Sequence, residues 1–251
     1  MEVSWWRLLG WPSEDQPLSQ YIVVKDCALC EGTPFLHQIA AAYLRNGFFL
    51  VYLSAETPWY SLYLNLRKLG VRLDSSQGRK RILFFDAADP SETNSNEDYP
   101  DCFMEHVAIN IRNGFDWIGQ ICNLMDKYLS ERRDPEHPLP VAVMLDSSTS
   151  ISFLNKESDT VGSLFHYLRV MEQKLAPTIY CVCQLVHFDM GYGEELLQEA
   201  KFYDSLVLHL DALSLGASSE QDGRLSVEDR DQVTYRVLFK ILENQIKLFT
   251  I

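Results

Sequence analysis

The chain has 251 residues, 47% of them hydrophobic and 23% charged, which is enough apolar material for one sizeable α/β domain or two small ones. Its 35 acidic and 22 basic residues give a net charge of -13, so the surface as a whole repels nucleic acid unless a local basic patch or a partner supplies positive charge. No apolar run approaches the roughly 20 residues that span a bilayer. We therefore expect a soluble protein of the cytoplasm or nucleus.

The chain begins with a tryptophan-rich segment, residues 1–19, which we expect to pack onto the body of the protein or onto a partner. Residues 20–251 are expected to form a single domain. Buried aromatic residues supply much of the energy of protein interfaces. Four tryptophans are therefore candidate interface anchors: Trp5, Trp6, Trp11 and Trp59.

After this segment, apolar strands alternate with amphipathic helices. Strands are predicted at residues 21–25, 48–54, 81–86, 141–146, 178–186 and 205–210. Helices are predicted to start at Thr33-Pro34 and Thr57-Pro58 and to cover residues 103–129, 161–175 and 194–201. The hydroxyl of Thr33 is expected to cap the first of these helices, and Gly47 to end it in a left-handed conformation.

Two other segments have a different character. Residues 86–101 contain acidic, proline and asparagine residues without a base and are expected to form a solvated loop. Residues 204–251 contain short alternating strands joined by turns, which predict an antiparallel meander. The whole pattern predicts an α/β protein with a RecA-like fold of the P-loop type, in which a mostly parallel central sheet has helices on both faces and an antiparallel hairpin region at its C-terminal end.

The loop after the first strand lies where a P-loop would bind a nucleotide phosphate. A P-loop needs G-x-x-x-x-G-K-[ST], because its backbone N–H groups surround the phosphates, its lysine neutralises them and its hydroxyl holds magnesium. In this frame Asp26 and Glu31 replace the two glycines, Gly32 replaces the lysine, and only Thr33 matches. The chain thus lacks an intact Walker A motif, and we expect no nucleotide cofactor and no metal.

Two more carboxylates occupy positions that are typical of RecA-type ATPases. Asp146 ends a strand, where an aspartate would hold a magnesium shell, and Glu56 follows a strand, where a carboxylate would orient the attacking water. The simpler interpretation is that each is a polar residue at the end of a buried strand. A divergent ATPase that uses Thr33, Glu56 and Asp146 with a lysine from elsewhere stays open, as does a RecA-like binding module such as a recombinase paralogue.

Basic residues, cysteines and histidines suggest weaker candidate sites. Two basic turns are candidate phosphate-positioning patches for RNA: Arg79, Lys80 and Arg81, and Arg132 and Arg133. Cys27-x-x-Cys30 resembles half of a zinc or redox motif, but the six cysteines are expected to be reduced, and these thiols buried and inert. The histidines in apolar elements or at strand ends are expected to form local hydrogen bonds: His37, His106, His166, His187 and His209.

Several stretches of the chain resemble the sixth subunit of the Elongator complex. They are "LHQIAAAYL", "RKLGVRLDSSQGRKRILFFD", "GSLFHYLRVM", "DALSLGASSEQDGRLSV" and "YRVLFKILENQIKLF", and the resemblance extends from about Ile22 to the end. The chain departs from that family at Glu220, where aspartate is usual, and at Pro58-Trp59-Tyr60, where Ser-His-Tyr is frequent. The fifth subunit, which has the same fold, is therefore a close second.

This resemblance implies a RecA-like subunit that has lost its ATPase motifs. It implies assembly with the fourth and fifth Elongator subunits into a hetero-hexameric ring with two copies of each. The ring is expected to act with the catalytic Elongator subcomplex, assisting tRNA binding during carboxymethyl-type modification of the wobble uridine. The catalytic chemistry would belong to the third subunit, so this chain is not expected to be an enzyme.

Overall fold

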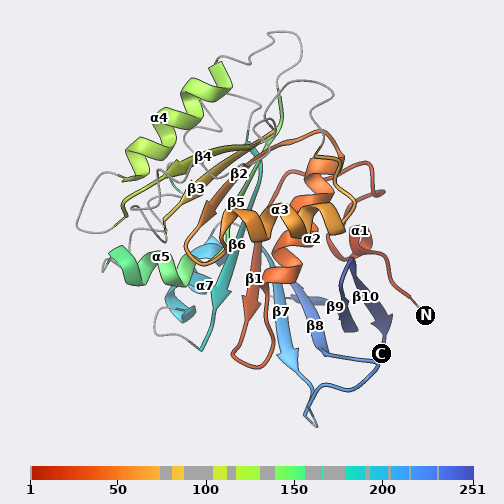
Figure 1. Cartoon of the computed structure of the whole chain (residues 1–251). Helices are drawn as coiled ribbons and strands as arrows, with labels where there is room; N and C mark the ends of the chain where they lie inside the picture. The colour runs from red at the N-terminus through yellow and green to blue at the C-terminus, as the bar shows by residue number, and fades with distance from the viewer. Residues whose placement is uncertain are drawn as a thin grey trace.

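A computed structural model of the chain describes residues 2–73, 81–87, 104–111, 117–130, 139–155, 166, 179–189, 193–202, 205–214, 216–230 and 232–251. Within these residues, ten strands form one sheet in the order β10-β9-β8-β7-β1-β6-β5-β2-β3-β4 (Figure 1). The seven strands from β7 to β4 pair in parallel, and β7 to β10 pair antiparallel. The sheet is therefore mixed, with a parallel central part and an antiparallel C-terminal edge.

The strand bounds follow the apolar runs of the sequence. They are β1 Gln20–Asp26, β2 Phe49–Ser54, β3 Ile82–Asp86, β4 Met104–Ala108, β5 Val141–Leu145, β6 Ile179–His187, β7 Leu206–Ala212, β8 Gly223–Asp229, β9 Gln232–Leu242 and β10 Gln245–Thr250. Strands β2 and β5 are buried at every position. This is expected of parallel strands that are covered on both faces.

Helices cover both faces of the sheet (Figure 1). They are α1 Trp5–Leu8, α2 Thr33–Arg45, α3 Trp59–Lys68, α4 Trp117–Ser130, α5 Ser148–Asn155 and α7 Gly193–Phe202. Apolar side chains of α1, α2 and α3 pack in one core, and those of α4, α5 and α7 pack in a second core on the opposite face. The parallel strands between these two layers end at one common edge, which carries the candidate site.

The six strands expected from the sequence, the helix that begins at Thr33 and the C-terminal meander are confirmed. Gly47 ends α2 with a φ of 86°, as expected of a left-handed C-terminal residue. The predicted helix at 161–175 and most of the predicted loop at 86–101 lie outside the described residues.

Three local predictions are wrong. Residues 104–108 form strand β4 and not the start of a helix, because they pair in parallel with β3 and this pairing outweighs the helix propensity of their side chains. The hydroxyl of Thr33 does not cap α2, because Thr33 is already the first helical residue. The capping position is Gly32, and the N-terminus of α2 has no side-chain cap. Helix α3 likewise begins at Trp59, after Pro58, and helix α5 was not expected at all.

Candidate functional site at the carboxyl edge of the parallel strands

Four polar side chains meet where neighbouring parallel strands end. Asp26 is the last residue of β1, His187 the last of β6, and Asp146 follows β5 directly. Glu56 lies two residues after β2. Because β1, β6, β5 and β2 are adjacent in the sheet, their carboxyl ends form one edge. In open α/β sheets this edge is where ligands usually bind.

The Asp26 carboxylate binds the loop between β1 and α2 from inside the chain. Its Oδ2 accepts the backbone N–H of Gly32 at 2.8 Å, and the side chain is almost fully buried. A phosphate bound by a P-loop would accept backbone N–H groups of this same loop. In this chain the N–H of Gly32 is bound by the chain's own carboxylate.

Gly32 also shows that the loop is folded down onto the core. A Cβ atom at this residue would lie 2.4 Å from Cδ1 of Leu185 and 3.1 Å from Cγ1 of Val24. Glycine is required here because the backbone contacts buried side chains, whereas in a P-loop glycine lets the backbone approach a ligand. Glu31, the other acid of the loop, is exposed, and Thr33 is half-buried.

His187 bridges two carboxylates. Its Nδ1 lies 2.8 Å from Oδ1 of Asp26, and its Nε2 lies 3.2 Å from Oε2 of Glu56. Both ring nitrogens can donate only when the imidazole is protonated. The hydrogen bonds to Asp26 and Glu56 raise the pKa of His187 to about 10, so the ring is a cation at neutral pH.

Glu56 completes this network on the solvent side. Its Oε1 accepts a hydrogen bond from the hydroxyl of Ser150 on α5. The hydrogen bond from His187, supported by that from Ser150, lowers the pKa of Glu56 to about 2 against the opposing effect of burial. Glu56 is thus ionised and already bound by groups of this chain, which is not the state of a free base that orients water.

Asp146 holds the loop between β2 and α3. Its carboxylate accepts the backbone N–H groups of Ala55 and Thr57, each at 2.7 Å, and the hydroxyl of Ser54. The side chain is almost fully buried, and burial raises its pKa against the lowering effect of these hydrogen bonds. Both oxygens are therefore used inside the protein, which agrees with the simpler interpretation of a polar residue at the end of a buried strand.

The arrangement is better suited to holding two loops than to acid–base catalysis. A histidine that is charged at neutral pH cannot accept a proton from a nucleophile. The hydroxyl of Ser150 donates to Glu56 and not to His187. Among the described residues, no group of three or more His, Cys, Asp or Glu side chains is placed to hold a metal ion.

Of the five basic residues that are candidates for RNA contact, the structure describes one, Arg81. Arg79, Lys80, Arg132 and Arg133 lie outside the described residues. The guanidinium of Arg81 donates to the backbone carbonyls of Leu44 and Phe48, and burial lowers its pKa. Arg81 thus supports the end of α2, and its contact with RNA phosphate stays a prediction.

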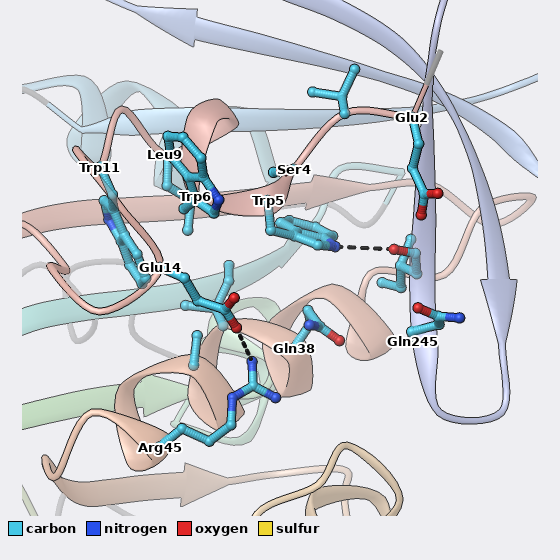
Figure 2. A pocket seen from close by; sticks show the side chains of 14 residues that line it. Glu2, Ser4, Trp5, Trp6, Leu9, Trp11, Glu14, Gln38, Arg45 and Gln245 are labelled. Carbon is cyan, nitrogen blue, oxygen red and sulfur yellow. Dashed lines mark hydrogen bonds and ion pairs between the residues drawn. The ribbon is translucent and has the colours of Figure 1, made fainter.

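The N-terminal tryptophans pack against the body of the same chain. Trp11 is 3% exposed and contacts Tyr43 edge-on, so it is a core residue and is not available as a partner-facing anchor. The indole of Trp5 donates to the carbonyl of Ile246 at 3.2 Å on the edge strand β10 (Figure 2). Trp5, Trp6 and Trp59 are partly buried, and their role at an interface stays a prediction.

A cavity of about 470 Å³ remains between the N-terminal segment, α2 and β10 (Figure 2). At this cavity, Glu14 and Arg45 form an ion pair, with 3.7 Å between Oε1 of Glu14 and Nη2 of Arg45. The backbone N–H of Val3 donates to the carbonyl of Leu248 at 2.9 Å. Residues 2–11 therefore cover part of the free edge of the sheet.

None of the described helices is long and apolar enough to cross a membrane.

Sequence reasoning missed the position of His187 between Asp26 and Glu56, because these residues are 161 and 131 positions apart from it. One signal was present, since each of the three stands at or just after the end of a predicted strand. The carboxyl ends of parallel strands meet at one edge, so the three side chains could have been placed together.

Comparison with known proteins identifies the fold. No protein-family model and no curated protein matches the sequence. An uncharacterised protein from Pyrococcus horikoshii, solved in complex with an unknown peptide, has a similar structure with a TM-score of 0.67 and 12% identity, over 92% of this chain and 91% of that chain. A KaiC-like protein from Pyrococcus horikoshii OT3 has a TM-score of 0.53 and 13% identity, over 93% and 90%. At such low identity the similarity concerns the fold alone, and the KaiC-like neighbour supports a RecA-like fold for this mixed α/β chain.

Proposed function

We propose that this chain is a non-catalytic assembly subunit with a RecA-like fold, of the kind represented by the sixth subunit of the Elongator complex. It would join the fourth and fifth subunits in a ring of six, in the cytoplasm or nucleus. This ring would assist tRNA binding while the catalytic subcomplex modifies the wobble uridine. The assignment to Elongator rests on the sequence resemblance.

The observation that carries the non-catalytic part is the bond between Gly32 and Asp26. A phosphate in a P-loop would accept a hydrogen bond from this backbone N–H, but here the N–H of Gly32 donates to Oδ2 of the buried Asp26 at 2.8 Å. That carboxylate is in turn paired with the cationic His187. A nucleotide would have to displace an internal ion pair and would meet negative charge, with no lysine of the loop to offset it.

Exposed apolar side chains at two separate places support the assembly part. Leu29, 83% exposed, lies in the turn between β1 and α2, and Tyr60, 52% exposed, lies in the first turn of α3. Val233 and Tyr235, 48% and 45% exposed, begin strand β9, next to the end of β8 that faces the amino edge. A head-to-tail ring needs two different contact surfaces on each subunit, and exposed apolar patches mark such surfaces.

The similarity in fold to a Pyrococcus protein that was solved with an unknown peptide is compatible with a docking role. It does not identify a partner. The net charge of -13 makes the isolated chain a poor ligand for tRNA, so RNA contact is expected only in the assembly, where partners supply positive charge.

Co-expression with the fourth and fifth Elongator subunits tests the proposal. We expect the three chains to co-purify, with a native mass equal to two copies of each. Leu29→Asp should weaken this assembly because it places a charge in an apolar contact, whereas Ile251→Asp, a matched change at a terminal residue that is 72% exposed, should not. Elution of this chain without its two partners would refute the Elongator assignment.

Titration of the isolated chain with ATP and Mg²⁺ tests the non-catalytic part separately. No saturable binding is expected. Binding at micromolar concentrations that is lost in Thr33→Ala would favour the divergent ATPase instead.

A further inference from the structure

The loop between β1 and α2 brings two cysteines face to face across a tight turn. Ala28 and Leu29 form the turn, and Cys27 and Cys30 flank it as an isolated antiparallel pair. The N–H of Cys30 donates to the carbonyl of Cys27 at 2.9 Å, and the N–H of Cys27 to that of Cys30 at 3.5 Å. Cys27 and Cys30 are both free thiols.

This backbone pairing sets the separation of the two residues. Directly opposed residues that exchange both hydrogen bonds have Cα atoms about 5.5 Å apart. Their side chains leave on the same face of the pair. Disulfides join residues whose Cα atoms are roughly 4.4–6.8 Å apart, so little backbone movement is needed to link these two sulfur atoms.

We propose that Cys27 and Cys30 form a reversible disulfide by exchange with a low-molecular-weight disulfide of the glutathione type. The Cys27 thiolate attacks one sulfur of glutathione disulfide and releases one glutathione thiolate. The Cys30 thiol then loses its proton and attacks Sγ of Cys27, which releases the second glutathione. The two protein thiols lose two electrons and two protons, and one glutathione disulfide becomes two glutathione thiols.

Exposure sets the order of these two steps. Cys27 is half-buried and borders the exposed turn, so an external disulfide can reach it. Cys30 is 6% exposed, and burial, together with the nearby Cys27 and Asp26, raises the pKa of its thiol to about 12. Cys27 is therefore the entry thiol and Cys30 the resolving thiol.

The other described cysteines do not share this geometry. Cys122, Cys181 and Cys183 are all buried, and the last two are alternate residues of the same strand, β6. The proposed disulfide would fix the turn that carries the exposed Leu29 and follows the ion pair of Asp26 with His187. The thiol state would thus be coupled to the shape of the carboxyl edge, whether or not the chain belongs to an Elongator ring.

The sequence allows a direct test on the full chain. Trypsin cleavage after Lys25 and Arg45 gives one peptide, residues 26–45, that contains Cys27 and Cys30 and no other cysteine. The folded protein is equilibrated in glutathione buffers of graded ratio, quenched with acid, alkylated in denaturant and digested. We expect mass spectrometry to show this peptide without alkyl groups and lighter by two hydrogen atoms, while the peptides with Cys122 and with Cys181 and Cys183 are fully alkylated.

The fold itself should promote closure. At a given glutathione ratio, the fraction of disulfide is expected to be higher in the folded chain than in urea. The reason is that the fold raises the effective concentration of one thiol near the other about tenfold. Cys30→Ser should accumulate a mixed disulfide with glutathione at Cys27, and Cys27→Ser should leave Cys30 unmodified. Double alkylation of residues 26–45 at every ratio, or closure no better in the folded chain than in urea, would overturn the proposal.

Discussion

The two loops at the carboxyl edge are held by the same kind of contact but balance its charge differently. In the loop between β1 and α2, the Asp26 carboxylate binds the N–H of Gly32 and is paired with the cationic ring of His187. In the loop between β2 and α3, the Asp146 carboxylate binds three N–H groups and the hydroxyl of Ser54, which are all neutral donors.

This difference shows two ways in which one edge of a sheet can hold a buried carboxylate. A buried carboxylate needs either a counter-ion or several hydrogen bonds, because an unpaired buried charge is costly. The first loop uses a counter-ion from β6, and the second uses backbone groups. The first loop should therefore respond to pH, and the second to the loss of its acceptor.

Loss of the acceptor at Asp146 should have the largest effect. Asp146→Ala would leave the N–H groups of Ala55 and Glu56 without their acceptor, and each unsatisfied buried group costs about 1–3 kcal/mol. The hydroxyl of Ser54 would keep the carbonyl of Thr57, and the N–H of Thr57 would keep the hydroxyl oxygen of Ser54. We expect the free energy of unfolding, measured by urea denaturation, to fall by about 3 kcal/mol or more. Asp146→Asn, which keeps one carbonyl oxygen, should lose less.

The same denaturation experiment can contradict this structural role. A magnesium ligand would make wild-type stability depend on Mg²⁺ and ATP, since a ligand that binds only the folded state raises stability. The midpoint should not move when both are added. A rise that is absent in Asp146→Asn would assign a ligand to this residue.

Gly32→Ala should have an intermediate effect, because the new Cβ would approach Cδ1 of Leu185 to 2.4 Å. Overpacking of this kind typically costs about 1–3 kcal/mol, and we expect about 2 kcal/mol. A double-mutant cycle with Leu185→Ala should show that the alanine at position 32 costs less once the larger side chain is gone. Equal costs in both backgrounds would mean that the loop is not packed on Leu185.

The sequence was a good guide to the strands and a poorer guide to the edges. Runs such as "FFLVYL" and "VAVML" are apolar at every position, and burial on both faces of a parallel sheet allows little else. Residues 104–108 contain Met, Glu and Ala, which favour helices, and only pairing with β3 makes them a strand. Such pairing is a long-range contact that no local pattern reveals.

The candidate site was predicted as separate residues and not as a network. Asp26, Glu56 and Asp146 were recognised because each stands where a known motif has a functional residue. The sequence could not show that their oxygens are bound inside the chain, since Asp26 and Glu56 depend on the distant His187. The packing of Gly32 against Leu185 is equally remote in the sequence.

His187→Gln should have the smallest effect at neutral pH and the most distinctive pH dependence. Glutamine cannot carry the charge, but its amide N–H can still donate to Asp26, which also keeps the N–H of Gly32. Glu56 is 41% exposed, so solvent screens that part of the network. We expect a loss of about 1 kcal/mol near pH 6. The pKa of His187 is raised in the folded state, from 6.5 to about 10, so its contribution is complete below pH 6.5 and disappears as the pH rises towards 10.

The stability difference between wild type and His187→Gln should therefore shrink steadily between pH 6.5 and pH 10, as measured by urea denaturation at each pH. On the acid side, the pKa of Glu56 is lowered from 4.5 to about 2, so its contribution is lost as the pH falls through that range. Glu56→Gln should flatten the acid side more than the alkaline side, because the bond between His187 and Asp26 remains. A difference that stays constant up to pH 10 would mean that His187 is neutral, and the first loop would then lack its counter-ion.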